Sequence, residues 1–263
     1  RQFDIRRQTG FTPIAIACFI ALYAPIIVLV IFSFSAAENV SVWSGFTLEW
    51  YRKAAQNQQV IDATLLSVKI AVSSAVFATA AATFAALATT RTDGYPGMTA
   101  KYAFINLPLM VPEIVTAVAL LILTARIKIW TGYSGIGYLI AAHAAFCIPF
   151  AYLPIRARLE SMDLTLERAA ADLYATPLKV FRHITLPLLW PGIIAGFMLA
   201  FVISLDDVVI TNFVKSGGQD TLPTYMLGQI RRSITPEINA ISTVFLGISI
   251  LIVTVFFFIT KKR

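Results

Sequence analysis

The chain has 263 residues, of which 58% are hydrophobic and only 13% are charged, and its formal net charge at pH 7 is +7. This composition leaves too little polar surface for an ordinary soluble domain, so lipid must cover much of the protein. The positive charge does not gather in a basic patch interleaved with aromatic residues, which argues against a nucleic-acid partner. The two cysteines, Cys18 and Cys147, fall inside apolar stretches and do not suggest a disulfide framework.

Six stretches are long and apolar enough to cross a membrane, since a transmembrane helix needs about 20 apolar residues. They cover residues 11–34, 64–90, 102–125, 136–155, 188–213 and 239–260. Backbone polar groups in lipid must be satisfied within the segment, so each stretch is expected to be a helix. A secretory signal peptide is the alternative for the first stretch, but its apolar run is too long and lacks a convincing cleavage site. The sequence therefore predicts an all-α membrane protein with six transmembrane helices.

Basic residues predict the orientation of the chain in the membrane. With the N-terminus in the cytoplasm, thirteen of the 21 Lys and Arg residues would lie inside and seven outside, with Lys69 within a span. We therefore expect both termini and the loop around Leu166 to be cytoplasmic, with anionic lipid attracting the positive charge. The outer loop at 35–63 carries Trp50 and Tyr51, whose rings suit a membrane interface or a docking partner. A second outer loop, 214–238, is expected to contain a short helix.

The third span contains an acidic residue, Glu113, directly after Pro112. Counted along a continuous helix from Lys101, it would lie roughly 18 Å into the membrane and therefore near its middle. Helix breaks at proline are tolerated where the backbone lines a cavity or meets protein. The Glu113 carboxylate could accept an ammonium group in this low-dielectric setting. A hydrogen-bonded structural role is the alternative.

In the fourth span, His143 and Cys147 are four residues apart on one helical face, a spacing that could offer two metal ligands. No further ligand cluster accompanies them. We therefore expect core packing rather than a metal site.

A charged segment at 163–187 separates the fourth and fifth spans. Its first part, 163–173, is rich in helix formers, with Thr165 as the expected N-cap. A second helix is expected over 178–184, because Pro177 suits a first helical turn. Three consecutive alanines give the first helix a small face that another protein can approach closely. The segment therefore predicts a docking loop of two short helices, and a plain connector, usually shorter and less regular, is the alternative.

Two adjacent acids, Asp206 and Asp207, lie near the end of the fifth span. An Asp in a span costs roughly 2.5–3.5 kcal/mol on insertion scales, so the pair needs a compensating use, such as a path for a cationic solute. Consecutive helical residues point about 100° apart, and Asp207 shares its face with Ser204 and Thr211. Asp207 is therefore the better candidate, and Asp206 would reach the same space or pair with a basic group. A structural ion pair or an interfacial acid is the alternative.

The charged segment resembles the EAA loop of importer-type ABC permeases, whose pattern is Glu-Ala-Ala, three residues, Gly, nine residues, Ile, one residue, Leu-Pro. The positions in register, including one from the longer common form of the motif, are Ala169, Ala170, Asp172, Ile184, Leu186 and Pro187. Two positions depart from the pattern: Arg168 stands where the Glu is expected, with Glu167 one place earlier, and Tyr174 replaces the Gly. In that family the loop inserts into a groove on a separate ATP-hydrolysing subunit, so the resemblance implies that all these residues couple this chain to an ATPase.

The resemblance extends over the whole chain. The sequence is similar to the C-type permease of spermidine/putrescine importers through Trp50-Tyr51, Pro108–Val115, His143 with Phe146–Phe150, and Ser204–Val209. It implies a type I ABC importer permease fold with cytoplasmic termini, with 1–263 as one permease domain in the bacterial inner membrane and 163–187 as its coupling loop. Asp207, Asp206 and Glu113 would then line the path of a polyamine.

The same resemblance implies four partners: a dimer of ATP-binding subunits, which would hold ATP and Mg, a second permease completing a heterodimer, a periplasmic substrate-binding protein, and membrane lipid. This chain would hold no cofactor and would not be an enzyme, and its sequence has no GxxxxGK[ST] phosphate cradle, HExxH or GxSxG. An importer for a different small solute, an ATP-independent cation channel and a membrane-embedded enzyme remain as alternatives. A secondary transporter is less favoured, because no repeat relates the two halves.

Overall fold

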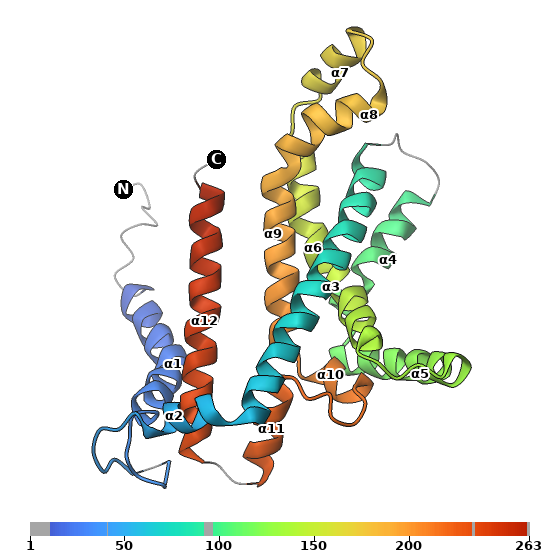
Figure 1. The fold of residues 1–263 in the computed structure, drawn as a ribbon. Coiled ribbons are helices and arrows are strands. Elements are labelled where there is room, and N and C mark those ends of the chain that lie inside the picture. The colour runs from blue at the N-terminus through green and yellow to red at the C-terminus, as the bar shows by residue number, and fades with distance from the viewer. Residues whose placement is uncertain (1–10, 41, 92–96, 233–234, 262–263) are drawn as a thin grey trace. The chain divides into compact units, whose positions relative to one another are not determined.

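The computed structural model describes residues 11–40, 42–91, 97–232 and 235–261, and these residues are mostly helical (Figure 1). The elements are α1 (Phe11–Phe32), α2 (Glu49–Gln56), α3 (Gln58–Thr90), α4 (Met98–Met110), α5 (Glu113–Thr131), α6 (Gly137–Glu160), α7 (Thr165–Asp172), α8 (Pro177–Val180), the π-helix η2 (Phe181–Thr185), α9 (Leu186–Asp206), α10 (Val209–Val214), α11 (Leu222–Arg232) and α12 (Pro236–Lys261). Strand-like pairing in these residues is limited to an isolated bridge between Ser35 and Phe46.

Six helical segments in the described parts of the chain are long and apolar enough to cross a membrane, which confirms the predicted fold class. They are Thr12–Phe32, Gln58–Thr90, Glu113–Thr131, Gly137–Glu160, Pro177–Asp206 and Pro236–Phe258. The short helix expected in the second outer loop is α11. The basic residues that precede α1 lie outside the described residues, so the orientation of the chain stays a prediction.

The third span differs from its prediction, because the helix expected over 102–125 is broken. α4 ends at Met110 and α5 begins at Glu113, with Pro112 as the N-cap of α5. Val111 is extended, with φ −90° and ψ 136°, because a residue that precedes proline is pushed out of the helical region. In Figure 1, α5 runs across α6 rather than alongside it. The helix from Lys101 is thus interrupted directly before Glu113, and the depth of Glu113 in the membrane stays a prediction.

The fifth span begins earlier and ends earlier than predicted. One continuous helical segment runs from Pro177 to Asp206, because η2 joins α8 to α9. A π-helical turn commonly interrupts an α-helix near functional sites, and here it lies just before Pro187, which has no N–H to donate. The helix stops at Asp206, since Asp207 is extended (φ −64°, ψ 130°), and α10 starts two residues later. The second helix predicted for the charged loop is thus the first turn of the same continuous helical segment that includes α9.

The chain forms two compact units, and residues 1–61 with 226–250 make up the first. Within it, the Trp50 Nε1–H donates to the Ser35 carbonyl at 2.8 Å. The hydroxyls of Tyr51 and Ser33 lie 2.6 Å apart. The polar atoms of both rings therefore hold the loop that precedes α2 onto that helix.

Residues 62–225 with 251–263 form the second unit, whose centre is the packing of α6 against α9. Gly196 permits this packing, because a Cβ atom there would lie 2.8 Å from the Ala151 carbonyl oxygen and 2.9 Å from Ile155 Cδ1. Small residues of this kind allow helix backbones to approach closely in membranes. A buried hydrogen bond of 2.8 Å between the hydroxyls of Tyr152 and Thr89 ties α6 to α3. This unit contains every residue of the candidate sites.

Candidate functional site

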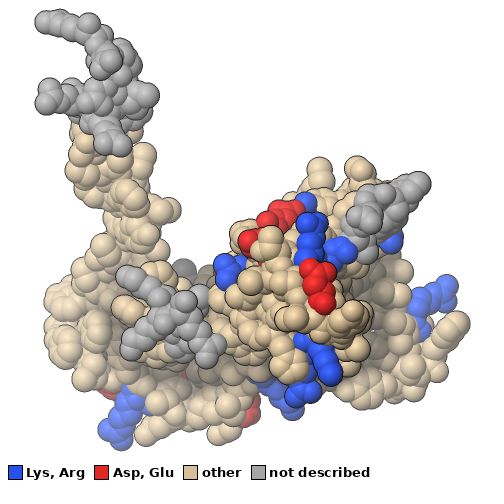
Figure 2. Space-filling model, turned by 90° about the horizontal axis from the view of Figure 1, so that it is seen from above, with Lys and Arg blue, Asp and Glu red and all other residues tan. Residues whose placement is uncertain are grey.

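The charged loop forms one end of the second unit, where α7 and α8 stand clear of the long helices (Figure 1). Viewed onto that end, Lys, Arg, Asp and Glu side chains gather together (Figure 2). The side chains of Arg168, Ala169, Asp172, Tyr174 and Pro187 are exposed, whereas Ala170, Ile184 and Leu186 are partly covered. The loop therefore exposes one side of α7 and turns Ile184 and Leu186 toward the chain.

The N-cap of α7 is Leu164 rather than the predicted Thr165, and Asp163 supports the start of the helix from one residue further back. Oδ1 of Asp163 accepts a 2.9 Å hydrogen bond from the backbone N–H of Thr165, the first residue of the helix. A short acidic side chain two residues earlier can reach this free N–H, as in an Asx turn. The hydrogen bonds from the Thr165 N–H and hydroxyl lower the pKa of Asp163 below its ordinary value.

The end of α7 explains why the EAA pattern has a glycine at the position of Tyr174. The Tyr174 N–H donates to the Ala171 carbonyl at 2.9 Å, and the Ala175 N–H donates to the Ala170 carbonyl at 3.1 Å. These two bonds define a Schellman motif, whose C′ residue takes the left-handed conformation and is usually Gly. Tyr174 adopts that conformation with φ 58°, which costs an L-residue roughly 1–2 kcal/mol. The loop thus keeps the shape of the motif without its glycine.

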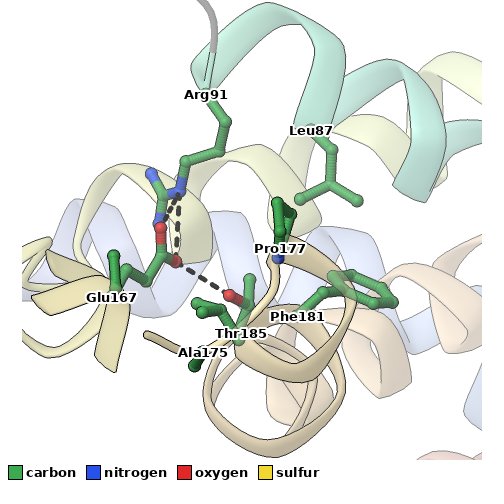
Figure 3. Close-up of a pocket in the computed structure, with 9 residues that line it drawn as sticks. Leu87, Arg91, Glu167, Ala175, Pro177, Phe181 and Thr185 are labelled. Atoms are coloured by element: carbon green, nitrogen blue, oxygen red, sulfur yellow. Dashed lines mark hydrogen bonds and ion pairs between the residues drawn. The ribbon is translucent and has the colours of Figure 1, made fainter. Parts of the chain in front are cut away.

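Glu167 turns inward and connects three elements of the unit (Figure 3). Its Oε2 lies 3.2 Å from Nε of Arg91, which directly follows α3. Its Oε1 accepts a 3.0 Å hydrogen bond from the Thr185 hydroxyl in η2. Arg91 also donates to the Leu159 carbonyl of α6 at 3.2 Å. We call Arg91, Glu167 and Thr185 the coupling brace, because they fasten α7 to the ends of α3 and α9.

A pocket of about 370 Å³ lies beside the coupling brace, and its walls are mostly apolar (Figure 3). It is lined by Leu87, Arg91, Glu167, Ala171, Ala175, Pro177, Val180, Phe181 and Thr185. The space between α3 and the two loop helices is therefore not fully packed. The polar contacts of the coupling brace thus provide much of the contact between α3 and the loop.

The second candidate site is formed where α9 ends. Asp207 is buried, and its carboxylate accepts hydrogen bonds from the N–H groups of Ile210 (3.2 Å) and Thr211 (2.8 Å) at the start of α10. It also accepts a 2.8 Å hydrogen bond from the Thr211 hydroxyl. Nε2 of His143 lies 3.3 Å from Oδ2 of Asp207, and Nδ1 of His143 lies 2.8 Å from the Ser204 hydroxyl. Asp207 therefore holds α6, α9 and α10 together.

Asp206 and Glu113 are exposed, unlike Asp207. Asp206 is the last residue of α9 and Glu113 the first of α5. The Glu113 carboxyl group is close enough to Asp207 and Asp206 to interact electrostatically with both. The structure thus brings all three predicted acids together, and burial assigns the accessible oxygens to Asp206 and Glu113 rather than to Asp207.

The pairing of His143 with Asp207 is a feature that the sequence pattern did not predict. A buried His in a span needs polar partners, and that requirement was the available signal. In the described residues, His143 and Cys147 belong to no group of three or more His, Cys, Asp or Glu side chains that could hold a metal ion. His143 is buried, and its contacts with Ser204 and Asp207 give it a structural role.

Comparisons with known proteins define the class to which this fold and these sites belong. Residues 99–262 match the family described as "Binding-protein-dependent transport system inner membrane component", and the chain belongs to that family. It is therefore a multi-pass permease subunit of the ABC importer class.

The chain is 39% identical over 232 residues to the putrescine transport system permease protein PotI of Escherichia coli K12, covering 87% of this chain and 83% of PotI. It is 36% identical over 242 residues to the spermidine/putrescine transport system permease protein PotC of Haemophilus influenzae, covering 92% and 93%. A chain of a bacterial ABC transporter that imports the acidic polysaccharide alginate has the same fold, with a TM-score of 0.76 at 17% identity over 95% of this chain and 93% of that one.

Proposed function

We propose that this chain is the permease of an ATP-driven importer of polyamines in the bacterial inner membrane, with both termini in the cytoplasm. The observation that carries the substrate class is the convergence of Glu113, Asp206 and Asp207 at the junction of α5, α9 and α10. Adjacent carboxyl groups in a membrane protein need a compensating cation, and a polyamine brings several ammonium groups on one flexible chain. The polyamine permeases among the relatives support the same assignment.

In this proposal the three acids have different roles. Asp206 and Glu113 offer exposed carboxylate oxygens to the passing ammonium groups. Asp207 is a positioning residue, since its own oxygens are occupied by α10 and His143. The site moves its substrate without covalent chemistry.

The loop at 163–187 is proposed as the coupling loop of the single permease domain. A pair of separate ATP-binding subunits, where ATP and Mg bind, would push on α7. The coupling brace would pass that movement to α3, and the continuous helix from Pro177 to Asp206 would carry it to the acidic cluster. A second permease would complete a heterodimer, and a periplasmic binding protein would deliver the substrate.

The experiment is uptake of radiolabelled putrescine into vesicles that contain the reconstituted importer and its binding protein. Asp206→Asn removes one accessible charge without changing the size of the side chain, and we expect uptake to fall at least about tenfold while the complex still assembles. Glu49→Gln is the matched control, because Glu49 pairs with Lys53 on α2, outside the acidic cluster, and uptake should be unchanged. Equal uptake by Asp206→Asn and wild type would reject the cluster as the cation path. Import of an uncharged or anionic solute instead would reject the substrate class.

A further inference from the structure

The tip of the coupling loop carries three apolar side chains that the chain itself leaves uncovered. Tyr174 is 96% exposed, Leu173 82% and Leu178 74%. We call these three residues the tip patch. They lie where α7 ends and α8 begins, at the end of the unit where charged side chains gather (Figure 2). An apolar patch in such surroundings is typical of a protein-binding surface.

Tyr174 occupies its position at an energetic cost. It is the one residue other than glycine with a positive φ in the described parts of the chain. Glycine would adopt this backbone conformation without the cost of roughly 1–2 kcal/mol. The ring gains almost nothing in return from this chain, because it is nearly fully exposed. Strained residues of this kind mark functional positions when an outside contact uses them.

The surroundings of the tip patch favour a protein partner over lipid. Asp172 lies directly before the patch, and an acid at that place would be costly to move toward acyl chains. Arg168, Lys179 and Arg182 are exposed on the same loop, and Glu167 and Asp163 already have partners within the chain. The free charge at the rim is therefore mainly basic, which suits an acidic rim on the partner.

We propose that Tyr174 is an anchor for the ATP-binding subunit: its ring, flanked by Leu173 and Leu178, fills an apolar recess on that subunit, and acidic side chains around the recess face the basic rim. Rigid aromatic side chains of this type dominate the binding energy at protein interfaces. The proposal rests on the coupling role proposed for the loop and adds the residue that selects the partner. An ATP-binding subunit shaped for a glycine at this position would lack the recess and would bind poorly.

The test compares binding of the purified ATP-binding subunit to the permease complex in lipid nanodiscs. Tyr174→Gly removes the ring and relieves the backbone strain, so weaker binding cannot be attributed to a destabilised loop. We expect the dissociation constant to rise at least about tenfold, whereas Tyr174→Phe should stay close to wild type. Trp130→Ala is the control, because Trp130 is also a strongly exposed aromatic residue but lies on α5, outside the loop, and its removal should have little effect.

The outcomes separate failure of the Tyr174 anchor from failure of the coupling role proposed for the loop. If wild type and Tyr174→Gly bind the subunit equally, the anchor is wrong while the coupling role stands. If the wild-type complex does not bind the subunit at all, the proposed function fails first. A third measurement tests whether the detergent-purified complex, as wild type and as Tyr174→Gly, sediments together with vesicles that contain anionic lipid. Loss of that binding in Tyr174→Gly, with binding of the subunit unchanged, would identify the tip patch as a membrane contact and overturn the proposal.

Discussion

Nε of Arg91 lies 3.2 Å from Oε2 of Glu167, and this ion pair joins the end of a transmembrane helix to the first helix of the coupling loop. Both side chains are only 18% exposed, so solvent screens the pair weakly. The contact gives Glu167 a role inside the chain, distinct from the partner-facing role that the family pattern implies for its glutamate.

Breaking this ion pair should uncouple α7 from α3. In Glu167→Gln, we expect more ATP to be hydrolysed per putrescine imported, because movement of α7 is no longer passed on fully. Loss of charge-assisted hydrogen bonds costs about 1.5–3 kcal/mol at this contact. The measurement is the ratio of ATP hydrolysis to uptake in reconstituted vesicles.

The charge-swapped double variant Arg91→Glu with Glu167→Arg provides the control for the ion pair. It should recover part of the coupling lost in each single variant. A swap of the exposed pair Lys53 and Glu49 should change nothing, since exposed i,i+4 pairs contribute little. A double variant no better than the single ones would show that the pair itself does not transmit the movement.

The Asp163 contact at the start of α7 predicts a pH dependence of the coupling loop. The folded-state pKa of Asp163 is lowered by hydrogen bonds from Thr165. The contact therefore stabilises α7 fully above the ordinary Asp pKa of about 3.9 and is lost as pH falls through the lowered folded value. We expect amide exchange at the start of α7, measured relative to Asp163→Asn at the same pH, to accelerate only in that acidic range. A constant ratio across that range would argue against this role of Asp163.

Asp207 should behave as a structural residue and Asp206 as a functional one. Asp207→Ala leaves the N–H groups of Ile210 and Thr211 and the Thr211 hydroxyl without their acceptor, which should cost about 1–3 kcal/mol of stability. Thermal unfolding of the purified protein measures this loss. Asp206→Asn should unfold at the wild-type temperature, because its side chain is exposed. The reverse order of stabilities would mean that the two acids have been assigned the wrong roles.

The lengths of the apolar stretches were enough to predict six spans, because lipid imposes both helix length and composition. The failures came from backbone breaks. The span predicted over 102–125 is divided at Val111 and Pro112, and the stop after Asp206 depends on hydrogen bonds that Asp207 makes to α10. Those contacts cannot be derived from hydrophobic periodicity.

At the candidate sites, local patterns were predictable and long-range pairings were not. The helix over α7 and the register of the loop follow from residues close in sequence. The partner of Glu167 is 76 residues away, on a different span, and nothing local points to it. The same holds for His143 and Asp207, which meet because α6 packs against α9.

The most direct test of the central claim, that ATP-driven movement enters through the coupling loop, is ATP-dependent putrescine uptake by Ala169→Trp. Ala169 is exposed on α7, so the indole fits without disturbing the fold but obstructs close approach of the ATP-binding subunit. We predict that wild type imports putrescine only when ATP is supplied, and that the variant loses this uptake while the chain remains folded in the membrane. Undiminished ATP-dependent uptake by Ala169→Trp, or wild-type uptake without ATP, would contradict the account.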